Sequence, residues 1–64
     1  MVEGAIRGEV IFEFRRIGNA VKVSAIHVPS NTEVSIVGSA GAGEQPLKAA
    51  ALQKLRYVIE KNKA

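Results

Sequence analysis

The chain has 64 residues, a formal net charge of +3, one histidine and no cysteine. Such a chain forms at most one domain, whose core is small because it buries only about 60% of the surface that the unfolded chain exposes. The absence of cysteine excludes disulfide bonds and thiolate metal sites, and one histidine is too few for the usual zinc site. Association with another chain is the remaining common way to stabilise a small core, so we expect a homo-oligomer, with a dimer favoured.

The distribution of charged and apolar residues along the chain indicates a soluble protein. The amino-terminal end has neither the basic start nor the apolar stretch of a secretory signal, and no apolar run approaches the ~20 residues that span a membrane. We therefore expect a cytoplasmic protein without membrane contacts. The excess positive charge lies after Gly43, where five basic residues accompany two acidic ones.

The first half of the chain predicts a hairpin. Residues 1–8 are expected to form a tail or a short extra strand. Residues 9–17 alternate between apolar and other side chains, which is typical of a strand with one buried face. Gly18-Asn19 is a two-residue hairpin turn signal, and a second alternating run follows at residues 20–28.

The two-residue turn determines the register, because Ile17 must then lie opposite Ala20. All aromatic and β-branched pairs fall on one face in this register. The expected pairs are Phe14 with Val23, Phe12 with Ala25, Val10 with His27, Ile11 with Ile26, and Arg15 with Lys22.

A third strand is predicted at residues 33–38. It follows the segment Pro29-Ser30-Asn31-Thr32, whose residue types favour a reverse turn. Pairing Val28 with Glu33 continues the buried face across this strand. The further pairs expected from this register are His27 with Val34, Ala25 with Ile36, and Ser24 with Val37.

A helix is predicted at residues 44–62. Leu47, Ala51, Leu55 and Val58 recur at helical spacing among good helix formers. The resulting order is β-β-β-α. We expect an α+β domain with a three-stranded antiparallel sheet in the order 1-2-3 and one C-terminal helix on one face.

The glycine-rich segment before the helix invites comparison with a phosphate-binding loop. Gly38 and Gly43 have the spacing of the P-loop glycines, but Glu44 and Gln45 stand where that motif has lysine and serine or threonine. A carboxylate there would repel phosphate. We interpret the segment as a turn that brings the helix onto the sheet, and we expect no cofactor and no small-molecule substrate.

Nothing in the sequence supports catalysis. His27 is placed at the end of the buried face, and no serine has the context of a nucleophile with a positioned base. We expect His27 to close one end of the core, and we expect no catalytic residue, no metal ligand and no enzyme activity.

The sheet face away from the helix is the predicted interaction surface. Three apolar side chains are expected at its centre with charged side chains around them, which is the usual anatomy of a contact surface. Arg15 opposite Lys22 is an unfavourable like-charge pair that can be relieved by an acid from a partner chain, or within the chain by Glu13, which is diagonal to Lys22. The two edges of the sheet are a second route to association. The predicted interface comprises Ile11, Glu13, Arg15, Lys22, Ile26 and Val37.

Nucleic-acid binding through the basic helix is the alternative function. Lysines can contact phosphates, and a tyrosine can stack on a base. An exposed helix face kept soluble by lysines has the same composition. The predicted contacts are Lys48, Lys54, Tyr57 and Lys61.

Two resemblances follow from the β-β-β-α order. The run GAGEQPLKAAALQKL (41–55) resembles the closing part of a double-stranded RNA-binding domain, although the lysine cluster of that family is reduced here to Lys48. The stretches GEVIFEFRRIGNAVKVSAI (8–26) and TEVSIVG (32–38), with the alanine-rich helix, resemble a family of very short uncharacterised bacterial proteins. This second resemblance covers nearly the whole chain and implies a single compact domain without implying an activity.

Overall fold

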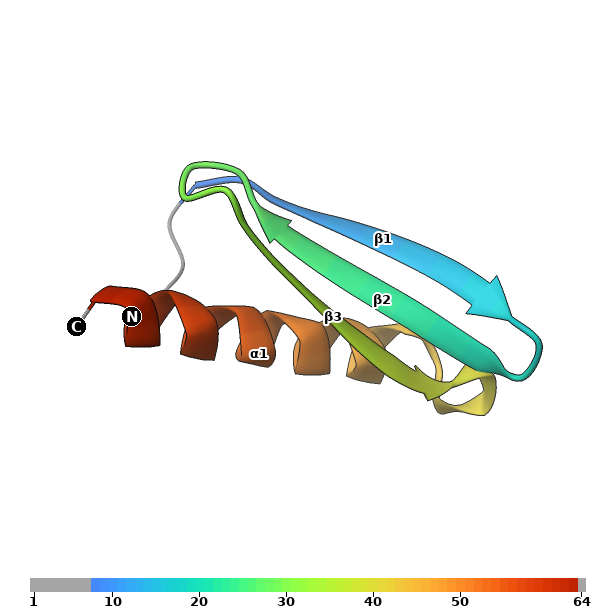
Figure 1. Cartoon of the computed structure of the whole chain (residues 1–64). Helices are drawn as coiled ribbons and strands as arrows, with labels where there is room; N and C mark the ends of the chain where they lie inside the picture. Colours follow the sequence, from blue (N-terminus) through green and yellow to red (C-terminus); the bar gives the residue numbers. More distant parts are fainter. Residues whose placement is uncertain (1–7, 64) are drawn as a thin grey trace.

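Three strands and one helix follow one another along the chain (Figure 1). The computed structural model describes residues 8–63, so the tail or extra strand expected at 1–8 lies outside the described residues except for Gly8. The elements are β1 (Val10–Ile17), β2 (Ala20–His27), β3 (Thr32–Ser39), the 3-10 turn η1 (Ala40–Ala42) and α1 (Glu44–Lys63). The sheet is antiparallel with strand order β1-β2-β3, which confirms the predicted α+β fold.

The first hairpin has the predicted register. Ile17 lies opposite Ala20, Phe14 opposite Val23, and the remaining pairs follow as expected. Gly18, the first of the two turn residues, has φ 60°. Tight hairpin turns require such a positive φ, which glycine adopts without steric cost.

The register predicted for the second hairpin is wrong by two residues. His27 lies opposite Thr32 instead of Val34, and Ala25 lies opposite Val34 instead of Ile36. The shift is even, so every β3 side chain stays on its predicted face of the sheet. The shift changes which β2 residue lies opposite each β3 residue.

The turn between β2 and β3 explains the shift. The turn begins at Val28, whose carbonyl accepts a hydrogen bond from the Asn31 N–H at 3.2 Å. Pro29 occupies the second position, which its fixed φ suits, and Asn31 adopts φ 56°, a left-handed value that asparagine tolerates. The turn therefore spans 28–31 instead of 29–32, and β3 begins one residue earlier than expected.

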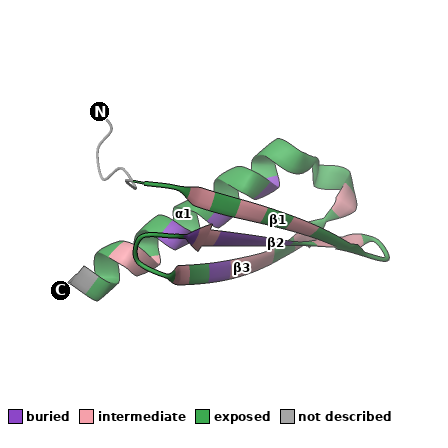
Figure 2. Ribbon diagram, turned by 90° about the horizontal axis from the view of Figure 1, so that it is seen from above, coloured by how far each residue is buried: buried purple, intermediate pink, exposed green. Residues whose placement is uncertain are grey.

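The core lies between α1 and the inner face of the sheet. Its buried members are Val23, Ala25, Val34, Leu47, Ala51 and Leu55. The helix packs mainly on β2 and β3. Figure 2 shows the consequence of this position. Buried residues line β2 and the sheet-facing side of α1, whereas β1 alternates between half-buried and exposed residues.

The glycines before the helix have structural roles. A Cβ on Gly38 would overlap the Leu47 side chain, so this strand residue allows the first turn of α1 to approach the sheet closely. Gly43 has φ 90° at the end of η1, and the Ser39 hydroxyl accepts a hydrogen bond from the Gly41 N–H at 3.1 Å. The two glycines that match the P-loop spacing therefore lie in different elements and do not form one loop.

Candidate interaction surface

The outer face of the sheet is built from rows of side chains that lie across the three strands. Because the second hairpin has a shifted register, these rows differ from the predicted ones. From the β2–β3 turn toward the β1–β2 turn, three rows are Ile11–Ile26–Glu33, Glu13–Ser24–Ser35 and Arg15–Lys22–Val37.

The apolar centre predicted on this face is therefore wrong in its composition. Val37 lies opposite Lys22 instead of Ser24, and a polar row separates it from the two isoleucines. In that row the Ser24 and Ser35 hydroxyls lie 3.2 Å apart, and Ser24 is only 5% exposed. The middle of the outer face is hydroxyl-lined, and Val37, 71% exposed, lies beyond it in the row of Arg15 and Lys22.

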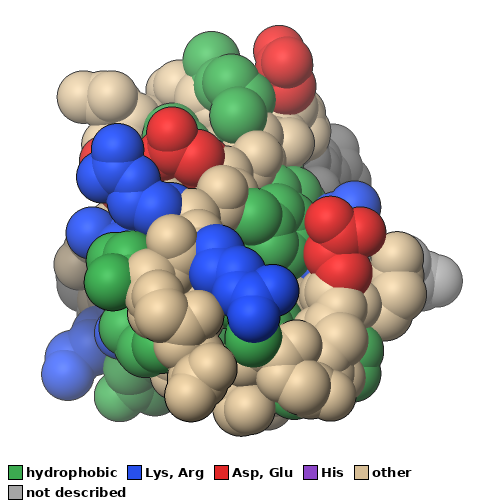
Figure 3. Space-filling view, turned by 90° about the vertical axis from the view of Figure 1, so that its right-hand side faces the viewer, with side chains coloured by type: hydrophobic (Ala, Val, Ile, Leu, Met, Phe, Trp, Pro, Cys, Tyr) green, Lys and Arg blue, Asp and Glu red, His purple; other side chains and the backbone are tan. Residues whose placement is uncertain are grey.

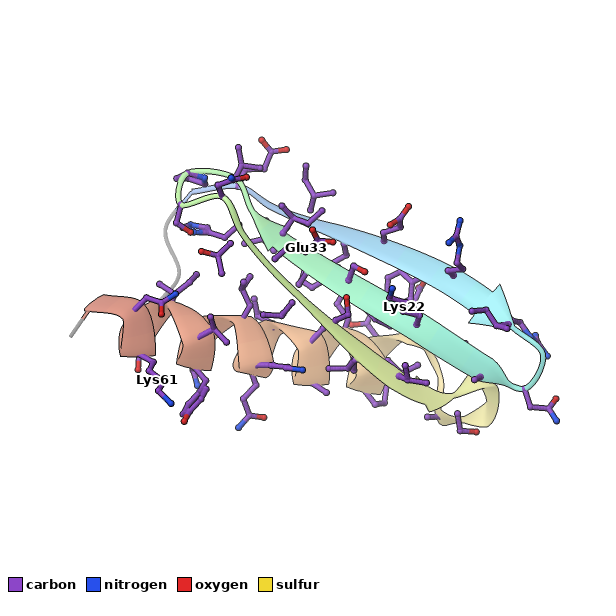
Figure 4. The ribbon with its side chains drawn as sticks, in the orientation of Figure 1. Lys22, Glu33 and Lys61 are labelled. Atoms are coloured by element: carbon purple, nitrogen blue, oxygen red, sulfur yellow. The ribbon has the colours of Figure 1, made fainter. Side chains whose placement is uncertain are left out.

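The charged residues of the outer face are spread along the sheet. Arg15 lies directly opposite Lys22, as predicted. Figure 4 shows that Lys22 on β2 and Glu33 on β3 project from separate parts of the sheet, consistent with the polar row between them. Glu33 is therefore not placed to relieve the Arg15–Lys22 repulsion, whereas Glu13 lies diagonal to Lys22 in the adjacent row.

Within residues 8–63 no strand pairs with the outer edge of β1, and we call this the free edge. It has a defined set of outward backbone groups. The Val28 N–H donates to the Glu9 carbonyl at 3.0 Å, so the odd-numbered residues of β1 direct their backbone groups toward β2. Since hydrogen-bonding direction alternates along a strand, the even-numbered residues direct theirs outward. These residues are Val10, Phe12, Phe14 and Arg16.

The inner side of this edge is apolar and incompletely covered. Val10, Phe12 and Phe14 pack against the core but are only half-buried, because α1 lies on β2 and β3. The Lys48 ammonium lies 4.9 Å from the centre of the Phe12 ring. Leu52, one turn further along the same flank of the helix, is 38% exposed.

A shallow pocket continues this uncovered region at the start of the helix. It has a volume of about 240 Å³, and Phe14, Val21 and Leu47 contribute its apolar lining. Arg16 and Glu44 carry its charges, and the Arg16 Nε–H donates to the Gly18 carbonyl at 3.1 Å. Figure 3 faces this end of the molecule and shows basic and acidic side chains around hydrophobic ones.

The other edge of the sheet is partly occupied. The Lys54 ammonium donates to the Ser35 backbone carbonyl of β3 at 3.0 Å. A lysine placed along an edge strand opposes pairing with another strand. Among the described residues, the β1 edge is therefore the more accessible one.

The helix does not bring the four predicted nucleic-acid contacts together. At 100° per residue, Lys54, Tyr57 and Lys61 share the flank near β3, whereas Lys48 lies on the opposite flank. Lys61 extends from the helix on the side away from the sheet, with its ammonium 5.8 Å from the Tyr57 ring centre (Figure 4). Lys48 and Lys54 already contact Phe12 and Ser35 within the chain.

His27 belongs to a small polar cluster at the β2–β3 turn. It is buried and lies beside Val10 as predicted, but its neighbour on β3 is Thr32. Its Nδ1 lies 2.6 Å from the Ser30 hydroxyl, which lies 2.8 Å from the Thr32 hydroxyl. These hydrogen bonds join the two ends of the turn and hold it in the observed register.

Two negative findings concern the residues that the structure describes. Within 8–63, no three His, Cys, Asp or Glu side chains gather in a group suited to a metal ion. The helix in this part of the chain is not long and apolar enough to cross a membrane.

The inner side of β1 was not among the predicted interface residues. Val10, Phe12 and Phe14 were assigned to the core from their alternation alone. One helix is narrower than a three-stranded sheet and covers only part of it. This difference in width is the signal in the sequence that would have indicated an uncovered strand. The sequence does not say which strand that is.

Comparison with known proteins gives a family and no activity. The family model described as a domain of unknown function (DUF6898) matches residues 7–62. The search of curated proteins and the search of solved structures each found no match. Since the family model covers nearly all of the strands and helix described above, this chain belongs to the DUF6898 family of domains of unknown function.

Proposed function

We propose that this chain is a small non-enzymatic interaction module that associates with a second copy of itself through the free edge of β1. The observation that carries the proposal is the position of the helix. Because α1 lies on β2 and β3, Phe12 and Phe14 stay half-buried next to a strand edge with which no other described strand pairs. A second chain added at this edge would satisfy the outward backbone groups and cover the aromatic rings.

The proposal predicts a dimer that depends on the β1 backbone. Sedimentation at micromolar concentrations should give the mass of a dimer for the native chain. Arg16→Pro removes one outward N–H without touching the bonds to β2, so it should produce a monomer. Arg16→Ala is the matched control; it keeps the outward N–H and should therefore weaken the dimer far less than Arg16→Pro does. A native chain that stays monomeric throughout this range would refute the proposal.

A further variant separates the two routes that the sequence left open. Ile26 lies on β2, in the outer face and away from the β1 edge. Ile26→Glu should leave an edge-mediated dimer intact and should disrupt a dimer formed through the outer face. Circular dichroism of each variant would verify that the fold is retained.

The second candidate is RNA binding through the β3 flank of the helix. The supporting observation is Tyr57, 63% exposed, with Lys54 and Lys61 on the same flank. This function predicts binding of a fluorescent single-stranded RNA that weakens steeply with salt, and loss of that binding in the Lys54→Ala, Lys61→Ala double variant. Absence of binding at low salt would eliminate this candidate.

A further inference from the structure

We infer that two copies pair their β1 strands antiparallel with Phe14 on the two-fold axis, so that Glu13 of each copy faces Arg15 of the other. This inference rests on the proposed self-association and specifies its register. It follows from the outward groups of β1, their order along the strand, and the charges on the outer face.

Backbone geometry limits the register to a few choices. Within β1, only Val10, Phe12, Phe14 and Arg16 direct their N–H and C=O groups outward, so hydrogen-bonded pairs between the β1 strands of two copies must join these residues. A two-fold axis through β1 then passes at Phe12, at Glu13 or at Phe14 if most of the strand is to pair. These three registers differ in which side chains face each other.

The outer-face charges distinguish the three registers. An axis at Glu13 places the two Glu13 carboxylates opposite each other, which is destabilising. An axis at Phe12 places Ile11 opposite a carboxylate of Glu13. It also places Glu9 opposite Arg15, but Glu9 precedes β1, so this pair lies beyond the end of the strand. An axis at Phe14 places Glu13 opposite Arg15 on both sides of the axis, so two attractive pairs form at once.

The same register matches the remaining side chains of the strand. Ile11 lies opposite Ile17 of the second copy, which pairs two isoleucines that the single chain leaves exposed. On the inner side the two Phe14 rings meet at the axis, and Phe12 lies opposite Arg16, an arrangement suited to a cation–π contact.

The register also places an acid directly opposite Arg15. Within one chain, Arg15 lies opposite Lys22. With the axis at Phe14, the Glu13 carboxylate of the second copy approaches Arg15 from its other side. One row across the dimer then contains Glu13 of the second copy, Arg15 and Lys22, so an acid adjoins the two bases.

Charge reversal tests this register. Glu13→Arg or Arg15→Glu alone should raise the dimer dissociation constant about tenfold or more, because each change turns two attractive pairs into repulsive ones. Mixing the two single variants should restore association as a heterodimer, since one copy then presents two arginines and the other two glutamates. The double variant Glu13→Arg, Arg15→Glu should again form a homodimer.

Sedimentation of the native chain and these four samples distinguishes the outcomes. Restored association in the mixture supports the register, because damage within the fold of one chain cannot be repaired by adding the other variant. A native dimer that either single variant fails to weaken, or a mixture that stays monomeric, overturns the register while self-association stands. A native monomer overturns both. Thermal unfolding of each variant would show whether lost association reflects lost folding.

Discussion

The burial difference between two leucines on α1 gives the sharpest test of how the helix sits on the sheet. Leu55 is 0% exposed and belongs to the core, whereas Leu52 is 38% exposed on the flank toward β1. Both lie within the same helix, so Leu→Ala changes helix propensity equally at the two positions. Any difference between the losses of stability in the two variants therefore reflects the difference in burial.

The expected magnitude for Leu55→Ala is large for so small a domain. Loss of the buried methylene and methyl groups and the cavity left behind together cost about 2–5 kcal/mol in well-packed cores. A domain of 64 residues is expected to have a total stability of about 3–10 kcal/mol at 0.05–0.15 kcal/mol per residue. Leu55→Ala should therefore remove about half of the stability or unfold the chain, whereas Leu52→Ala should cost less than about 1 kcal/mol.

Urea denaturation followed by circular dichroism measures both values. The variants and the native chain must be compared at one protein concentration, because association adds to apparent stability. Equal costs at Leu52 and Leu55, or a larger cost at Leu52, would mean that the helix presents a different face to the sheet and would refute the packing described above.

Three further substitutions test local features of the fold. Gly38→Val should cost about 1–3 kcal/mol in urea denaturation because its side chain would collide with Leu47; unchanged stability would contradict the close approach of helix and sheet. Asn31→Ala should lower stability by about 1–2 kcal/mol through the left-handed backbone, whereas Asn31→Gly should be nearly neutral in thermal unfolding; equal effects would exclude the observed turn. Lys54→Met should lower the unfolding temperature slightly by removing the hydrogen bond to the β3 carbonyl, and an unchanged or higher temperature would mean that this contact does not stabilise the fold.

The two hairpins show which part of the register local sequence can determine. Gly18-Asn19 forms a two-residue turn, which leaves only one way to pair its flanking strands, and β1 and β2 pair as predicted. The second connection is longer, and a turn over 28–31 or over 29–32 is compatible with the same residue types. The hydrogen bonds of Asn31 and His27 select the first of these, and local propensity does not reveal that choice.

The composition of the outer face was affected by that choice. Ile11 and Ile26 are neighbours because the first hairpin makes them so. Val37 was predicted to lie opposite Ser24 but lies opposite Lys22, so it does not join the two isoleucines in one apolar centre. A register error of two residues preserves the face of each side chain but changes every cross-strand neighbour.

By itself, the sequence determined the order of elements, the period-two and helical patterns, and therefore the side of each element that faces the core. Only the tertiary structure decided where the helix lies across the sheet. A single helix is too narrow to cover three strands, and its position depends on contacts between distant residues, such as Leu47 over Gly38. That position leaves β1 half-covered, and the proposed interaction surface follows from it.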